Sequence, residues 1–170
     1  MTNAIELNPK TTAALIRTML KGAFPATKFS VTTARGSMVS AVDVRWTDGP
    51  TRKAVDALVQ CLRDGHFDGM TDSHEYAKGV DRFVIVNGVT YAKGTRYVST
   101  SRKTSRALAE RAAAQVAAYY GVAAPVIGVN QWGSWTVEND HTARAFSGSW
   151  DWSDLIYQAT NDRTRFSRAA

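Results

Sequence analysis

The block of residues 28–76 constrains the fold of this chain more than any other part of its sequence. It begins with two short runs, 28–32 and 39–46, in which polar and apolar residues alternate. Alternation with a period of two is typical of half-buried β-strands, and Gly36 lies between the runs. The sequence therefore predicts a β-hairpin at the start of this block.

A helix is expected directly after the hairpin. The turn Thr47-Asp48-Gly49-Pro50 precedes it, and Asp48 or Thr51 can accept hydrogen bonds from the free N–H groups of a first helical turn. The segment 51–66 places its apolar residues on one face, and Gly65 ends it. The next stretch, 67–72, is rich in turn-forming residues and is expected to be irregular.

The same reasoning predicts the other elements. Asn87-Gly88 between two apolar runs is a strong hairpin signal, because both residues tolerate positive φ. The remaining expected elements are a helix at 9–24, hairpin strands at 82–86 and 89–91, a strand at 97–99, a helix at 101–120, short strands at 126–127 and 134–137, and a last helix at 150–160.

These elements predict an α+β fold in the order αββ-αββ-α. We expect two β-hairpins to join one antiparallel sheet packed on three helices, with an aromatic-rich C-terminal segment. The expected organisation is a single domain over 1–170, made of a core module at 9–120 and a cover of loops and a short helix at 121–170. The aromatic residues of that cover, Trp132, Trp135, Phe146, Trp150 and Trp152, either fill a core or line a surface that binds a partner.

Composition limits the class of protein. Of the 170 residues, 44% are hydrophobic and 21% are charged, which is typical of a globular domain that can bury its own core. Cys61 is the single cysteine, so an intrachain disulfide is excluded and a reducing compartment is favoured. The sequence shows neither a run long enough to span a membrane nor a secretory signal, so a cytoplasmic protein without a membrane partner is expected.

The net charge of +6 is unevenly distributed. Seven cations lie within 82–111 against Glu110 alone, whereas 43–75 holds seven acids and four cations. A basic surface of this kind favours a nucleic acid or an acidic protein as partner. The candidate binding residues lie within 91–106, a stretch without acids: Lys93, Arg96, Tyr97, Arg102, Lys103 and Arg106. Arginine and lysine neutralise phosphates and tyrosine stacks on unpaired bases, although the same cations also keep exposed strands soluble.

Four short motifs resemble one known family. They are Phe24-Pro25, Lys28-Phe29-Ser30-Val31, Trp46-Thr47-Asp48-Gly49-Pro50 and Phe67-Asp68-Gly69. Together they are similar to the large polyvalent protein-associated domains, in particular the twenty-ninth type. The resemblance covers roughly residues 11–76 and extends more weakly to about 120. It implies a protein of phages or conjugative plasmids, of the kind thought to travel with incoming DNA and protect it, and it implies no reaction.

Catalytic signatures are weak. A nucleophile elbow, a phosphate loop and a known metal-binding spacing are all missing from the sequence, so we expect a non-catalytic protein without a cofactor or a metal. One alternative stays open at this point. His66, Asp68, Asp72 and His74 have the side chains of metal ligands, which allows a metal-dependent enzyme, although Asp68-Gly69 also reads as an ordinary turn.

The sequence therefore predicts an accessory protein of a mobile element that antagonises a host defence system. It would act by binding a host defence protein or a nucleoprotein complex through its basic surface. Sequence-independent binding of DNA or RNA is the second hypothesis. We expect charge reversal at Arg96 and Arg102 to abolish partner binding without lowering the melting temperature.

Overall fold

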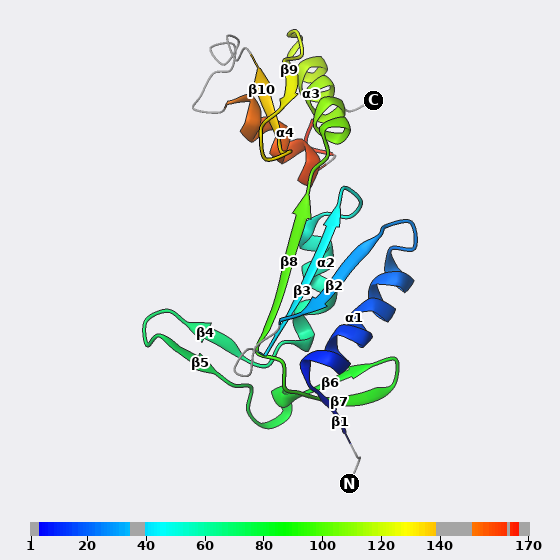
Figure 1. Ribbon diagram of the computed structural model, residues 1–170, viewed down its shortest axis with the longest axis vertical. Helices are drawn as coiled ribbons and strands as arrows, with labels where there is room; N and C mark the ends of the chain where they lie inside the picture. Colours follow the sequence, from blue (N-terminus) through cyan, green and yellow to red (C-terminus); the bar gives the residue numbers. More distant parts are fainter. Residues whose placement is uncertain (1–3, 35–39, 139–150, 163, 167–170) are drawn as a thin grey trace. The chain divides into compact units, whose positions relative to one another are not determined.

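The computed structural model describes residues 4–34, 40–138, 151–162 and 164–166. The chain divides into two compact units, Met1–Arg102 and Lys103–Ala170, each with its own core (Figure 1). Helices and strands occur in both units, so the α+β class is confirmed. The expectation that 1–170 acts as a single domain stays a prediction. Within the described ranges, no helix is long and apolar enough to cross a membrane.

The first unit contains most of the strands. Its elements are β1 (Ile5–Leu7), α1 (Pro9–Ala23), β2 (Phe29–Thr33), β3 (Ala41–Thr47), α2 (Arg52–Val59), the 3-10 turn η1 (Gln60–Leu62), β4 (His66–Asp68), β5 (Ser73–Glu75), the 3-10 turn η2 (Gly79–Arg82), β6 (Phe83–Val86), β7 (Val89–Lys93) and β8 (Tyr97–Lys103). The Asn8 side chain accepts hydrogen bonds at the start of α1, and Thr51 caps α2 as the sequence predicts.

The main sheet has the strand order β2-β3-β8. Strands β2 and β3 form the predicted antiparallel hairpin, whose register pairs Phe29 with Trp46; Gly36 lies outside the described residues. Strand β8 lies on the other side of β3, and the two arrows point the same way in Figure 1. Alternate residues of the sheet, among them Val44 and Val98, are buried against Ile16 of α1 and Val55 of α2. One face of this sheet therefore forms the core of the unit.

The second hairpin does not join the main sheet, so the single antiparallel sheet is a wrong prediction. Strands β6 and β7 pair through the predicted Asn87-Gly88 turn, and both turn residues have positive φ. Strand β7 also pairs with β1 in parallel, which gives a separate sheet of order β1-β7-β6. Its inner residues Val84, Val86 and Tyr91 pack against the same core. Strand β7 therefore pairs with β1 and not with the main sheet, and the two small sheets pack on one core.

A third hairpin lies where the sequence predicts irregular structure. Strands β4 and β5 pair antiparallel, with His66 opposite Glu75 and Asp68 opposite Ser73. The Asp68 carboxylate accepts hydrogen bonds from the N–H of Met70 and the hydroxyl of Thr71, which closes the turn. These bonds lower the pKa of Asp68, the one from the Met70 N–H most strongly. The predicted turn is thus present, with a short strand on each side.

The second unit contains α3 (Arg106–Tyr120), β9 (Val126–Val129), β10 (Trp135–Glu138) and α4 (Trp152–Asn161). Helix α3 packs its alanine-rich face, including Ala109 and Ala113, against α4 and β9. The last helix expected at 150–160 is present as α4, whereas α3, expected on the sheet of the core module, packs in the core of this unit. Trp152 is fully buried and Trp135 packs against this core, whereas Trp132 is 76% exposed. Phe146 and Trp150 lie outside the described residues.

Candidate functional site

A single β-bridge brings together the two connections that form the candidate site. Arg63, after η1, pairs in parallel with Thr95, between β7 and β8. The N–H of Asp64 donates to the carbonyl of Thr95 over 2.8 Å. The buried Thr95 hydroxyl donates to the carbonyl of Leu7 over 3.1 Å and lies 2.7 Å from the hydroxyl of Thr12. Thr95 therefore fixes the Arg63 segment to β1 and α1.

A pocket of about 700 Å³ lies beside this bridge, at the base of the β4–β5 hairpin. A volume of this size is within the range of small-molecule sites. Its walls come from the η1–β4 connection, the hairpin, η2 and the end of β7. The lining residues are Arg63, Gly65, His66, His74, Glu75, Tyr76, Ala77, Lys78, Asp81 and Lys93. Three separate segments thus each contribute one permanent cation.

The cations of the pocket are largely without carboxylate partners. Within the described part of the chain, no carboxylate oxygen lies within 4.0 Å of the Lys78 or Lys93 ammonium group. Arg63 donates from Nε to the carbonyl of Gly65 over 2.8 Å. Of the two acids, Glu75 lies 3.5 Å from His66 across the hairpin, a contact that is ionic when the imidazole is protonated. The pocket therefore has an excess of positive charge available to an anionic ligand.

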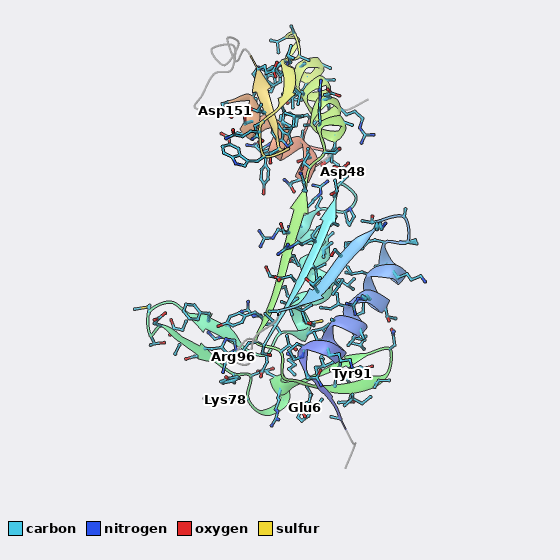
Figure 2. The ribbon with its side chains drawn as sticks, in the orientation of Figure 1. Glu6, Asp48, Lys78, Tyr91, Arg96 and Asp151 are labelled. Atoms are coloured by element: carbon cyan, nitrogen blue, oxygen red, sulfur yellow. The ribbon has the colours of Figure 1, made fainter. Side chains whose placement is uncertain are left out.

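Three aromatic rings and one arginine form a cluster at the edge of the pocket. The ring of His74 lies 4.9 Å from that of Tyr76 and 5.4 Å from that of Tyr97, both in edge-on geometry. Arg96 lies over the Tyr76 ring, 5.3 Å from its centre, and donates to the Tyr76 hydroxyl. Figure 2 shows Arg96 and Lys78 in this part of the molecule. Since Tyr76 and Tyr97 are 47% and 38% exposed, both rings are accessible to a ligand.

His74 is held in a defined orientation. Its Nε2 lies 2.5 Å from the carbonyl oxygen of Asp64, so Nε2 carries the hydrogen and donates. The Asp64 carboxylate accepts a hydrogen bond from the N–H of Ala77 over 3.2 Å. These bonds tie β5 to the η1–β4 connection, and they fix the position of the Tyr76 ring beside the pocket.

The structure separates the six binding residues predicted from the sequence. Lys93 lines the pocket, and Arg96 and Tyr97 belong to the aromatic cluster. Arg102 lies five residues beyond Tyr97 in β8, about 17 Å away at the usual rise of a strand. Its guanidinium donates to the carbonyls of Asp48 and Gly49, over 3.1 and 3.4 Å, and so holds the turn after β3. Arg102 therefore has a structural role in the first unit.

The last two predicted residues belong to the second unit. Lys103 is exposed at the end of β8. Arg106 lies in the first turn of α3 and forms an ion pair of 2.7 Å with Glu110, one helical turn further on. This exposed pair offsets part of the Arg106 charge within α3.

Sequence reasoning missed Arg63, Tyr76 and Lys78, and it named His74 only as a candidate metal ligand. Arg63 and His74 lie inside the acid-rich stretch 43–75, where the local charge argues against a basic site. Only the long-range bridge between Arg63 and Thr95 brings them beside Lys93. A single sequence carries no local signal for that contact.

The four residues of the metal alternative do not form a common ligand set. His66 pairs with Glu75, Asp68 closes its own turn, and His74 donates to a backbone carbonyl. Strand alternation also places His66 and His74 on opposite faces of the β4–β5 hairpin. Across the described ranges, no group of three or more His, Cys, Asp or Glu side chains could hold a metal ion.

Cys61 lies near the site without belonging to it. Its side chain is exposed at the surface, with Sγ 3.4 Å from the carbonyl oxygen of Leu58. Partial burial raises the pKa of the Cys61 thiol, and the nearby Lys93 ammonium offsets part of that rise. Cys61 is thus a poor nucleophile that nevertheless responds to the charge on Lys93.

Comparison with known families identifies the first unit. The model of the family described as large polyvalent protein associated domain 29 matches residues 7–105, which is more than half of the chain. The chain therefore belongs to this family, as its sequence motifs indicate. The match includes the whole pocket and ends before α3. Comparisons with curated proteins and with solved structures returned no match. Membership associates the protein with phages and other mobile elements.

Proposed function

We propose that this chain is a non-catalytic accessory protein of a mobile element that antagonises a host defence system. It binds its target, a defence protein or its nucleoprotein complex, through the basic and aromatic surface of the first unit. This surface is formed by Arg63, Tyr76, Lys78, Lys93, Arg96 and Tyr97. The observation that carries the proposal is the convergence of four cations and two exposed tyrosines from segments far apart in the sequence.

The composition of this surface matches that of a binding site. Tyrosine and arginine are the residues that most often dominate binding at interfaces, and Arg96 already stacks on Tyr76. Lys78 and Lys93, which have no carboxylate partner among the described residues, attract an anionic target from a distance. The family supports a mobile-element context. In that context, the anionic target is either a host component or the incoming DNA itself.

A transformation assay in hosts with defined defence systems tests this proposal. The chain is expressed in strains that each carry one such system, and the entry of a restricted plasmid is measured. We expect the wild-type chain to restore entry in at least one strain, and Lys93→Glu/Arg96→Glu to lose this effect at an unchanged melting temperature. Restoration by the double variant as efficient as that by wild type would contradict a role for this surface.

The second candidate function is direct binding of DNA or RNA without sequence preference. It is favoured by the exposed faces of Tyr76 and Tyr97 beside Lys78 and Lys93, since stacking platforms flanked by cations are typical of single-strand binding. Competition between oligonucleotides of unrelated sequence tests it. Equal affinities, with single strands preferred over duplexes, support this function, and a strong preference for one sequence contradicts it.

A further inference from the structure

We infer that the pocket beside the β4–β5 hairpin binds a nucleoside phosphate, either a free mononucleotide or the phosphorylated end of a strand. The inference rests on the proposed function, because the pocket is part of the same surface. It goes further by naming one nucleotide unit as the group that enters the pocket. The pocket volume of about 700 Å³ is large enough for a ligand of this size.

The three cations of the pocket supply the recognition of phosphate. Arg63, Lys78 and Lys93 come from three different segments, so their charges converge only in the folded protein. The Nε–H of Arg63 donates to the Gly65 carbonyl, and this hydrogen bond orients the guanidinium. An oriented guanidinium beside two ammonium groups that no carboxylate of the described residues contacts is a suitable site for a doubly charged phosphate.

The other walls of the pocket suit the rest of a nucleotide. Asp81 is an exposed acid of η2 on the pocket wall, and carboxylates accept hydrogen bonds from the hydroxyls of ribose. Tyr76 offers an aromatic ring that is 47% exposed, and Arg96 lies over that ring. A base stacks on the exposed part of this ring, beside the Arg96 guanidinium. Cations, a carboxylate and an aromatic ring in one pocket therefore favour a nucleotide over inorganic phosphate.

Calorimetric titration of the full chain tests this inference. The probes are adenosine 5′-monophosphate, adenosine and inorganic phosphate, each titrated into wild type and into Lys78→Ala/Lys93→Ala. The control variant Lys10→Ala/Lys53→Ala removes two exposed lysines from α1 and α2 of the same unit. We expect the nucleotide to bind wild type and the control equally, and the pocket variant at least about tenfold more weakly, because charge-assisted contacts are lost. Binding of adenosine as tight as that of the nucleotide, or full binding by the pocket variant, would overturn the inference.

A second arm separates the two sources of the phosphate. Oligonucleotides of one sequence are compared with a 5′-phosphate and with a 5′-hydroxyl. Tighter binding of the phosphorylated strand, with displacement by the mononucleotide, supports a strand end as the ligand. Binding of the mononucleotide with no difference between the strands supports a free nucleotide. Strands that bind equally well, without displacement and without binding of the mononucleotide, overturn this inference and leave the proposed function standing.

Discussion

Arg63 and Thr95 are partners in one parallel β-bridge, although two hairpins lie between them in the sequence. This pairing places Arg63 beside the segment that carries Lys93 and Arg96. The bridge is held to the core, because Thr95 is fully buried and its hydroxyl forms hydrogen bonds with β1 and α1. The candidate site is thus built on the core of the first unit.

Replacing Thr95 by valine is expected to destabilise the first unit. Valine has nearly the same side-chain shape as threonine, but the Thr12 hydroxyl and the Leu7 carbonyl lose their hydrogen bonds to the Thr95 hydroxyl. This loss should lower the free energy of unfolding by about 1–3 kcal/mol. Urea denaturation measures this change. Thr32→Val, on an exposed position of β2, is the control and should change stability by less than about 0.5 kcal/mol. Equal stabilities of the two variants would show that Thr95 does not anchor the bridge.

Gly65→Ala is expected to open the base of the β4–β5 hairpin. Gly65 has a φ of 75°, and a Cβ there would lie 1.7 Å from the carbonyl oxygen of Glu75. The backbone has to shift, which adds to the cost of about 1 kcal/mol or more for a left-handed conformation. Gly69→Ala is a matched control in the same hairpin, since nothing lies within 4 Å of its added Cβ. Hydrogen exchange should show faster exchange of the β4 and β5 amides in Gly65→Ala only; equal protection in both variants argues against this close packing.

The two arginines proposed for charge reversal are expected to behave differently. Arg102→Glu removes the donors that hold the Asp48 and Gly49 carbonyls, so it should lower the melting temperature. The contacts of Arg102 thus predict a different result from the sequence, from which its reversal is expected to leave the melting temperature unchanged. Arg96→Glu should weaken partner binding and leave the melting temperature nearly unchanged. Thermal unfolding with a binding assay on both variants separates the two roles, and a stable Arg102→Glu protein would contradict this division.

Alkylation of Cys61 is expected to report the charge on Lys93. Because burial raises the pKa of Cys61, the thiolate fraction at neutral pH is small, and the reaction with iodoacetamide should speed up as the pH rises through that pKa. Lys93 lowers the pKa of Cys61, so Lys93→Ala should raise it and slow the reaction at pH 8. Lys53→Ala, which changes an exposed lysine of α2, should have no effect. Identical pH profiles for wild type and Lys93→Ala would contradict the proximity of the two groups.

The sequence predicts local structure better than it predicts which strands pair with each other. The Thr51 cap of α2 and the Asn87-Gly88 turn depend on neighbouring residues, and both are confirmed. The pairing of β8 with β3 and of β1 with β7 is long-range, and alternating strands fit more than one partner. Strands β4 and β5 carry mostly polar residues, so no apolar period marks them.

The same limit applies to the site. The linear run 91–106 contains Lys93, Arg96 and Tyr97, which do lie at the candidate site. Arg102 and Arg106 belong to the same run, yet they serve the fold through a turn and an ion pair. A run of cations shows where positive charge is available, whereas the partner of each side chain depends on tertiary contacts.

The salt dependence of binding tests the central claim most directly. Fluorescence anisotropy measures the affinity for labelled single-stranded DNA from low to high salt, for wild type, Lys78→Ala/Lys93→Ala and the control Lys10→Ala/Lys53→Ala. We expect log affinity to fall linearly with log salt, and the slope to become shallower by roughly 0.7 for each phosphate-binding lysine lost from the pocket. The control should keep the slope of wild type. Equal slopes for all three proteins, or no binding at low salt, would contradict the assignment of this surface to phosphate binding.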